Sequence, residues 1–293
     1  MTELGGPERF RGLVNHYASK YSETDLGAET ASVATQVGRT LDEVLLGNLY
    51  YDTLKCAFGC TAFAVDSPDG PIHARNLDWW ADGGILSRYT LLSRFHQSGE
   101  ERFVTVGWPG YIGALSGMAP GRFAVTLNSV FGLDQPAAGT PVSFLIREVL
   151  EKAGDFDEAV ERLSSEELCC DCLLLVTGAR QGEIAVIERT PKRHAVRGAE
   201  EDVAVVTNNY RLLDWDASAA AGSLALSSCD RYDRANEMLS DRRPANGVEC
   251  FRILGDPNVQ MTITMQQMAF HAATGQVEVR LPDLDAGLFP PSE

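Results

Sequence analysis

The stretch Cys60-Thr-Ala-Phe-Ala-Val-Asp-Ser-Pro-Asp-Gly-Pro-Ile-His-Ala-Arg-Asn-Leu-Asp78 combines two apolar runs with a strong turn signal between them. Ser-Pro-Asp-Gly at 67–70 is typical of a reverse turn, so the runs on either side are predicted to pair as an antiparallel hairpin. Counting back from the turn places Cys60 near Leu77 and brings Arg75, Asn76 and Asp78 beside the start of the first strand. The hairpin therefore gathers a thiol, a guanidinium and a carboxylate at one end of a sheet.

This grouping suits nucleophilic chemistry at Cys60. A thiol has a reference pKa of about 8.5, and a nearby guanidinium favours the thiolate. If the chain is cut between Gly59 and Cys60, the new α-amine can take the thiol proton and later protonate the leaving group, with Asp78 holding the amine. The alternative is that Cys60 is a small buried residue and that Arg75 and Asp78 form a surface ion pair. The hairpin by itself leaves both interpretations open.

The remaining sequence predicts helices, then strands, then helices, then strands again. Residues 7–55 are predicted to be helical, with a capping box at Thr40 and Glu43. Two further helices are expected, one starting at Thr140-Pro141 with the proline at the first helical position and one starting at Asp155 with a second capping box. Besides the hairpin, strands are predicted at 103–108, 122–128, 173–177, 183–188, 203–207, 259–264 and 277–281. This order favours an α+β sandwich over alternating βαβ units.

Composition excludes several classes of function. The 293 residues are 44% hydrophobic, which is enough for a large core, and the net charge of −16 lacks the basic footprint of a nucleic-acid binder. The first 21 residues are polar, and no segment has the length and apolarity of a membrane span, so a cytoplasmic location is expected. The seven cysteines are then expected to be thiols. A homo-oligomer is left open.

Short motifs recur in a fixed order across residues 30–280. They are LDEVLLGNLYYD at 41–52, CTAFAV at 60–65, IHARNLD at 72–78, GWPGYIG at 107–113, LSGM at 115–118, TLN at 126–128, VLE at 149–151, FDEA at 156–159, GE at 182–183, TN at 207–208 and TIT at 262–264. In this order and spacing the chain resembles the acid ceramidase and N-acylethanolamine acid amidase family. That family is a branch of the choloylglycine-hydrolase-like N-terminal-nucleophile (Ntn) hydrolases. The resemblance implies a four-layer αββα sandwich with antiparallel sheets.

The resemblance also implies residue roles and a division of the chain. Cys60 matches the family nucleophile, freed by self-cleavage after Gly59, and Arg75 and Asp78 match its paired partners. The division would leave 1–59 as a helical prosegment, the α subunit after cleavage, and 60–293 as the catalytic domain, the β subunit. The further matches are an oxyanion-hole amide from Asn208, a second active-site arginine at Arg231 with Arg234 as its competitor, and a further oxyanion contact from Asn128.

Other side chains have two interpretations each. Trp79 and Trp80 could line an acyl pocket or the core, and the loop containing Trp108 is expected near the substrate. Cys169-Cys170-Asp-Cys172 invites a metal site, but no second ligand pair of suitable spacing follows it, so buried thiols and no metal are expected. No cofactor is expected either.

The sequence thus predicts an enzyme that hydrolyses a linear amide through a thioester on Cys60. An N-acyl amine with an apolar acyl chain is the substrate class that the resemblance implies. Two alternatives are an acyltransferase that uses the same nucleophile and an uncleaved, non-catalytic binding protein on the same scaffold. Ala62 departs from the serine that family members often carry two residues after the nucleophile, which bears on substrate more than on mechanism.

Overall fold

The N-terminal region consists of short helices instead of one long one. The computed structural model describes residues 11–53, 58–79, 84–130, 138–214 and 223–282. Within 11–53 the helices are α1 (Arg11–Tyr21), α2 (Asp25–Val37), α3 (Leu41–Asn48) and α4 (Tyr50–Thr53). The region predicted to be helical over 7–55 is therefore interrupted by turns. One of them is at Gly38, whose left-handed φ of 64° ends α2. The capping box of Thr40 and Glu43 is confirmed at the start of α3.

The predicted hairpin forms the centre of the first sheet. Its five antiparallel strands run in the order β10-β1-β2-β11-β12. The bounds are β1 (Phe58–Val65), β2 (Ile72–Trp79), β10 (Val203–Val206), β11 (Thr264–His271) and β12 (Gln276–Arg280). Cys60 pairs with Leu77 and Gly59 with Asp78, so the predicted register is correct. The Gly70 N–H donates to the Ser67 carbonyl at 3.0 Å and closes the turn.

The second sheet is a seven-stranded antiparallel meander in chain order from β3 to β9. Its strands are β3 (Leu91–Gln97), β4 (Glu100–Gly107), β5 (Ser116–Ala119), β6 (Phe123–Asn128), β7 (Cys172–Gly178), β8 (Ile184–Arg189) and β9 (His194–Arg197). It packs face to face on the first sheet, because β1 contacts β6 and β7 while β10 contacts β8.

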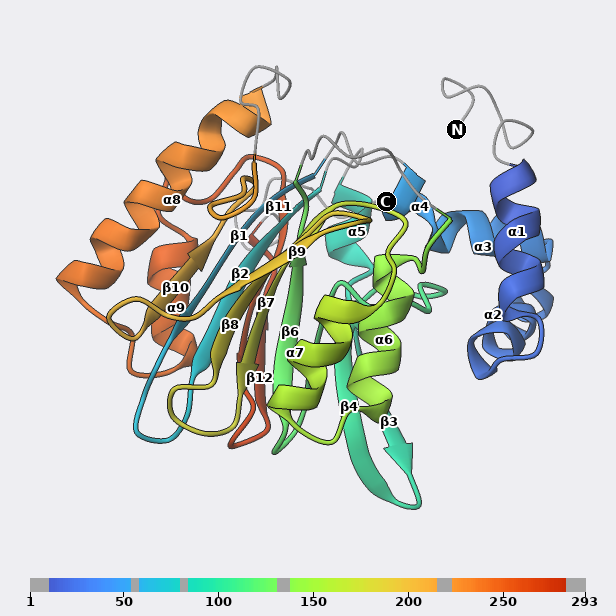
Figure 1. The fold of residues 1–293 in the computed structure, drawn as a ribbon, viewed down its shortest axis with the longest axis horizontal. Coiled ribbons are helices and arrows are strands. Elements are labelled where there is room, and N and C mark those ends of the chain that lie inside the picture. Colours follow the sequence, from blue (N-terminus) through green and yellow to red (C-terminus); the bar gives the residue numbers. More distant parts are fainter. Residues whose placement is uncertain (1–10, 54–57, 80–83, 131–137, 215–222, 283–293) are drawn as a thin grey trace, which may run out of the picture.

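Helices cover the outer faces of both sheets, which gives the four-layer αββα sandwich (Figure 1). Helices α6 (Val142–Lys152) and α7 (Phe156–Ser165) pack on the second sheet, and α8 (Ser223–Asp241) and α9 (Gly247–Leu254) on the first; α5 (Ile85–Arg88) is one short turn near β11. Asp155 caps α7 as predicted, but Glu158 reaches back to the Gly154 N–H, so the box is shifted by one residue. Pro141 is the N-cap of α6 and not its first helical residue.

The predicted strand at 259–264 is wrong. The backbone there turns after α9, since the Asp256 carbonyl accepts the N–H groups of Val259 and Gln260 and the Thr264 N–H returns to Met261. The strand instead begins at Thr264 and continues through the polar pair Gln266 and Gln267, which is buried because β11 is a central strand. Polar residues in a buried strand hide its pattern. The elements β3, β5, β9, α5, α8 and α9 were not predicted.

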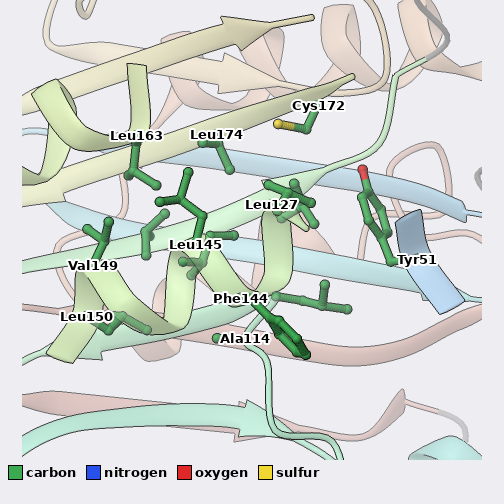
Figure 2. Close-up of a cluster of buried hydrophobic side chains, with 14 of the residues drawn as sticks. Tyr51, Ala114, Leu127, Phe144, Leu145, Val149, Leu150, Leu163, Cys172 and Leu174 are labelled. Carbon is green, nitrogen blue, oxygen red and sulfur yellow. The ribbon is translucent and has the colours of Figure 1, made fainter. Parts of the chain in front are cut away.

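One core cluster joins the N-terminal helices to the sandwich. Figure 2 shows Tyr51 of α4 in the same apolar cluster as Leu127, Leu145 and Leu174. Tyr21 of α1 makes an edge-to-face ring contact with Phe144 of α6 at 5.0 Å. The N-terminal helices are therefore packed parts of this core.

Among the described residues, no helix combines the length and the apolarity that a bilayer crossing requires. The cytoplasmic location and the homo-oligomer stay predictions.

Candidate active site

The Cys60 thiol lies near the start of β1, only 2% exposed, between the two sheets. The Arg75 guanidinium donates through Nη2 to Sγ at 3.0 Å, and the Leu127 carbonyl oxygen of the opposite sheet lies 3.8 Å from the same sulfur. Burial raises the pKa of the Cys60 thiol, while the positive charge of Arg75 opposes that rise. Arg75 is thus placed to favour the thiolate where burial alone would keep the thiol neutral.

The backbone of Cys60 is contacted by two further side chains. Its N–H donates to Asn208 Oδ1 at 3.1 Å, and its carbonyl oxygen accepts from Arg231 Nη1 at 2.7 Å. Arg231 Nη2 also donates to Asn208 Oδ1 at 2.7 Å, which connects the two groups. Burial lowers the pKa of Arg231, and the neighbouring Asp78 opposes that change. The competitor Arg234 instead donates to Asp256 and Glu237, so the structure brings Arg231 and not Arg234 to Cys60.

Asp78 and Gly59 lie side by side across the hairpin. A Cβ atom on Gly59 would lie 3.1 Å from Asp78 Oδ2 and 2.8 Å from the sulfur of Met261, so a larger residue here would require these side chains to shift. Asp78 Oδ1 accepts from the Thr264 hydroxyl at 2.6 Å. Burial raises the pKa of the Asp78 carboxyl, and Arg231, Thr264 and Arg75 oppose the rise. The carboxyl group therefore stands beside the Gly59–Cys60 peptide bond.

Asn208 is held by residues that the sequence did not point to. Its N–H donates to Ser228 Oγ at 2.8 Å, and its Nδ2 donates to the Ser129 carbonyl at 2.8 Å and to Ser129 Oγ at 3.2 Å. Ser129 directly follows the Leu-Asn motif, which was the one available signal for it. Thr264, which contacts Asp78, ends the TIT motif at 262–264, and that motif was its signal. Ser228 gave none, because isolated hydroxyl residues are common on helices.

Asn128 has a different place from the one expected. Its Nδ2 donates to the carbonyl oxygens of Val206 and Thr207, each at 3.0 Å. Both amide hydrogens are therefore directed to the end of β10, where they fix the backbone that leads into Asn208. This geometry favours a positioning role for Asn128 over a direct oxyanion contact.

An apolar cavity of about 500 Å³ lies between the N-terminal helices and the end of β2. Trp79, the residue after Asp78, stacks on Tyr50 with 5.7 Å between the ring centroids. It also makes an edge-to-face contact with Trp108, with 5.2 Å between the ring centroids. Trp108 Nε1 donates to the Leu86 carbonyl, which fixes its ring. Trp80 lies outside the described residues. The remaining lining is Val33, Val37, Val44, Gly47, Asn48, Ile85, Leu86, Pro109, Gly110 and Tyr111.

Comparison with known proteins identifies the family. Residues 65–275 match the acyl-coenzyme A:6-aminopenicillanic acid acyl-transferase family. The chain belongs to this family. The matched range covers most of both sheets and the helices between them, and it begins five residues after Cys60.

Relatives of this family member include acid ceramidase from Bos taurus, 26% identical over 210 residues, which are 64% of this chain and 51% of that protein. The N-acylethanolamine-hydrolyzing acid amidase of Caenorhabditis elegans is 28% identical over 186 residues, 58% of this chain and 52% of that protein. The chain thus spans about half the length of the curated relatives it matches.

A solved structure shares the fold. The N-acylethanolamine-hydrolyzing acid amidase ortholog of Caenorhabditis elegans is 24% identical, with a TM-score of 0.59 over 80% of this chain and 97% of that one. It confirms the predicted fold class. The family match and the sequence relatives confirm the predicted resemblance to the acid ceramidase and N-acylethanolamine acid amidase branch of the Ntn-hydrolases.

Proposed function

We propose that this chain is a self-processing cysteine amidase, with 1–59 as prosegment and 60–293 as catalytic domain. One observation carries the proposal: the thiol, the amide N–H and the carbonyl of Cys60 are each contacted by a different side chain, from Arg75, Asn208 and Arg231. These side chains come from a strand, a loop and a helix that are far apart in sequence. The two backbone groups would need partners in any buried residue, but a cysteine that only filled space in the core would not need a guanidinium at its sulfur.

The first reaction is the cut. The Cys60 thiolate attacks the Gly59 carbonyl carbon, a C–S bond forms, the peptide C–N bond breaks, and the released nitrogen takes a proton to become the α-amine of Cys60. Water then hydrolyses the thioester, which leaves a carboxylate on Gly59 and restores the thiol. Arg75 stabilises the attacking thiolate, and Asp78 lies beside the bond that breaks.

Turnover reuses the same sulfur. The new α-amine, with a reference pKa of roughly 8, accepts the thiol proton and then delivers it to the leaving amine of the substrate. The acyl group passes through a thioester that water hydrolyses. The Asn208 amide supplies the oxyanion contact when its Nδ2 exchanges the longer of its two hydrogen bonds, 3.2 Å to Ser129 Oγ, for the substrate oxygen. A donor of this kind is worth on the order of 3 kcal/mol in the transition state.

The apolar cavity supports the substrate class. Its aromatic lining includes Trp79, which follows Asp78 directly, so the cavity lies at the end of the strand that carries Arg75 and Asp78. We propose an N-acyl amine with an apolar acyl chain, with Trp79 and Trp108 as its binding residues. No metal or cofactor takes part in these steps.

Intact mass and N-terminal sequencing of the purified protein test the proposal. We expect two fragments, the second beginning at Cys60, and hydrolysis of N-acyl amines. Cys60→Ala should remain one chain and lose all hydrolysis, whereas Cys229→Ser, which removes an exposed thiol on α8, should behave as wild type. A Cys60→Ala protein that still matured or still hydrolysed amides would exclude Cys60 as the nucleophile.

A second candidate is acyl transfer, because the matched family bears the name of an acyl-transferase. The thioester would then be captured by an amine instead of water. Offering competing amines during turnover separates the two, since a transferase gives mainly the new amide and a hydrolase mainly the free acid. An inert binding protein would give neither product, would stay full length, and would leave Cys60 unreactive toward thiol probes.

A further inference from the structure

A second group of thiols lies outside the Cys60 site. Cys169 and Cys170, just before β7, both lie with Sγ at 3.3 Å from Asp52 Oδ1 of α4. The three ligand-type atoms are all within 4.8 Å of one another. More than a hundred residues separate Asp52 from the two cysteines. The sequence pattern at 169–172 lacked a further ligand, and the tertiary structure supplies one.

We propose that Asp52, Cys169 and Cys170 form a site for one thiophilic divalent metal ion, with Zn²⁺ as its representative. Tetrahedral zinc binds sulfur at about 2.3 Å and carboxylate oxygen at about 2.0 Å, which puts the two ligand atoms about 3.5 Å apart. The observed distance of 3.3 Å from Asp52 Oδ1 to each sulfur is close to that ligand-to-ligand distance. A water molecule would complete the fourth position.

The surroundings suit such a site. The Val142 N–H at the start of α6 donates to Asp52 Oδ1 at 3.0 Å and so orients the carboxylate. Cys169 and Cys170 are buried while Asp52 is half-buried. Binding replaces two thiol protons, which are released to solvent.

The consequence concerns the N-terminal helices. Asp52 lies seven residues before Gly59, whereas the two cysteines precede β7. A bound ion would link α4, which precedes the proposed cut, to the segment before β7 of the second sheet, which follows the cut. It would hold the two fragments together after cleavage, and it would bind equally well if no cleavage occurred.

Cobalt(II) titration of the reduced full-length Cys60→Ala protein tests the site. This background removes the Cys60 thiol as a competing ligand, so the result is independent of the proposed enzyme activity. We expect one cobalt ion per chain, a cobalt–thiolate charge-transfer band in the near ultraviolet, and release of two protons. The band should be lost on adding Cys170→Ser, affinity should fall roughly 10–100-fold on adding Asp52→Asn, and Cys229→Ser should change neither.

A protection experiment avoids variants that could fail to fold. In the wild-type chain, Zn²⁺ should slow alkylation of Cys169 and Cys170 by iodoacetamide, as read by peptide mapping, and leave that of the exposed Cys229 unchanged. The proposal is overturned if no thiolate band forms, if the band survives Cys170→Ser, or if alkylation of the pair is the same with and without zinc.

Discussion

The two groups of buried thiols in this molecule have opposite electrostatic surroundings. Cys60 lies 3.0 Å from the Arg75 guanidinium, while Cys169 and Cys170 lie 3.3 Å from the Asp52 carboxylate. A cation beside a thiol favours its ionised form, whereas the Asp52 carboxylate oxygen accepts a hydrogen bond from each of the other two thiols. The two groups of cysteines thus share their burial and differ in the charge of the nearest partner.

The difference also separates two kinds of chemistry. The Cys60 site supplies its own positive charge and needs no ion. The site of Asp52, Cys169 and Cys170 has an anion at its centre, so a metal cation is what would convert its thiols to thiolates. Changes at Arg75, His73 and Glu188 test how far the surroundings of Cys60 and Asn208 matter.

Removing the guanidinium should have the largest effect. Arg75→Gln leaves Cys60 buried but removes the positive charge that lowers its pKa. The pKa of the thiol should therefore rise, and kcat/KM should fall by about a thousandfold. The pH dependence of alkylation at Cys60 reports the pKa directly. Arg234→Gln, which loses only the contacts with Asp256 and Glu237, is the matched control and should retain wild-type activity.

Because Arg75 also donates to the Leu115 carbonyl and Ser116 Oγ, circular dichroism and thermal unfolding must show that the variant is folded. A folded Arg75→Gln protein with activity within threefold of wild type would remove the distinction between the two thiol groups.

The pKa of His73 tests the effect of the same Arg75 charge on a neighbouring side chain. It lies on β2 two residues from Arg75, bonded to Thr126 and Thr177, and burial together with the charge of Arg75 lowers its pKa to about 3. Between pH 6.5 and 3 the unfolded chain binds a proton that the folded chain does not, so stability falls as pH falls through this window. The loss is about 3 kcal/mol by pH 4.

His73→Gln should flatten this pH dependence by about that amount in urea unfolding measured from pH 7 to pH 4. The matched control is His271→Gln, since His271 is only partly buried and bonds locally to Thr274. Equal slopes in wild type and His73→Gln would mean that His73 is not held neutral.

The smallest effect is expected at Glu188, which is fully buried on β8. Its carboxylate accepts the N–H groups of Arg211, Leu212 and Leu213, each at 2.9 Å, and so fixes the loop that begins at Asn208. Glu188→Gln should lower kcat about tenfold with little change in KM, because a displaced oxyanion donor acts only in the transition state.

Glu183→Gln on the same hairpin is the control for Glu188→Gln, since Glu183 pairs with the exposed Arg180 at the turn. A change confined to KM, or an equal loss in both variants, would show that the loop does not position Asn208 for catalysis.

Short-range sequence signals specified the local parts of the site. The Ser-Pro-Asp-Gly turn and the apolar runs beside it were enough to pair Cys60 with Leu77 and to bring Arg75 and Asp78 to the same end. The helix starts at Thr40 and Asp155 followed from capping side chains a few residues away. These features depend on short-range geometry, so neighbouring residues specify them.

Only the tertiary structure decided the remaining contacts. Asn208 and Arg231 reach Cys60 from 148 and 171 residues away, and Asp52 meets Cys169 and Cys170 across the layers. Such contacts depend on how the two sheets stack and on which helix face packs against them, and no local pattern encodes that. The strand at β11 was misplaced for the same reason, because the amide groups of its buried glutamines donate to residues distant in sequence, as when Gln267 donates to Asn76.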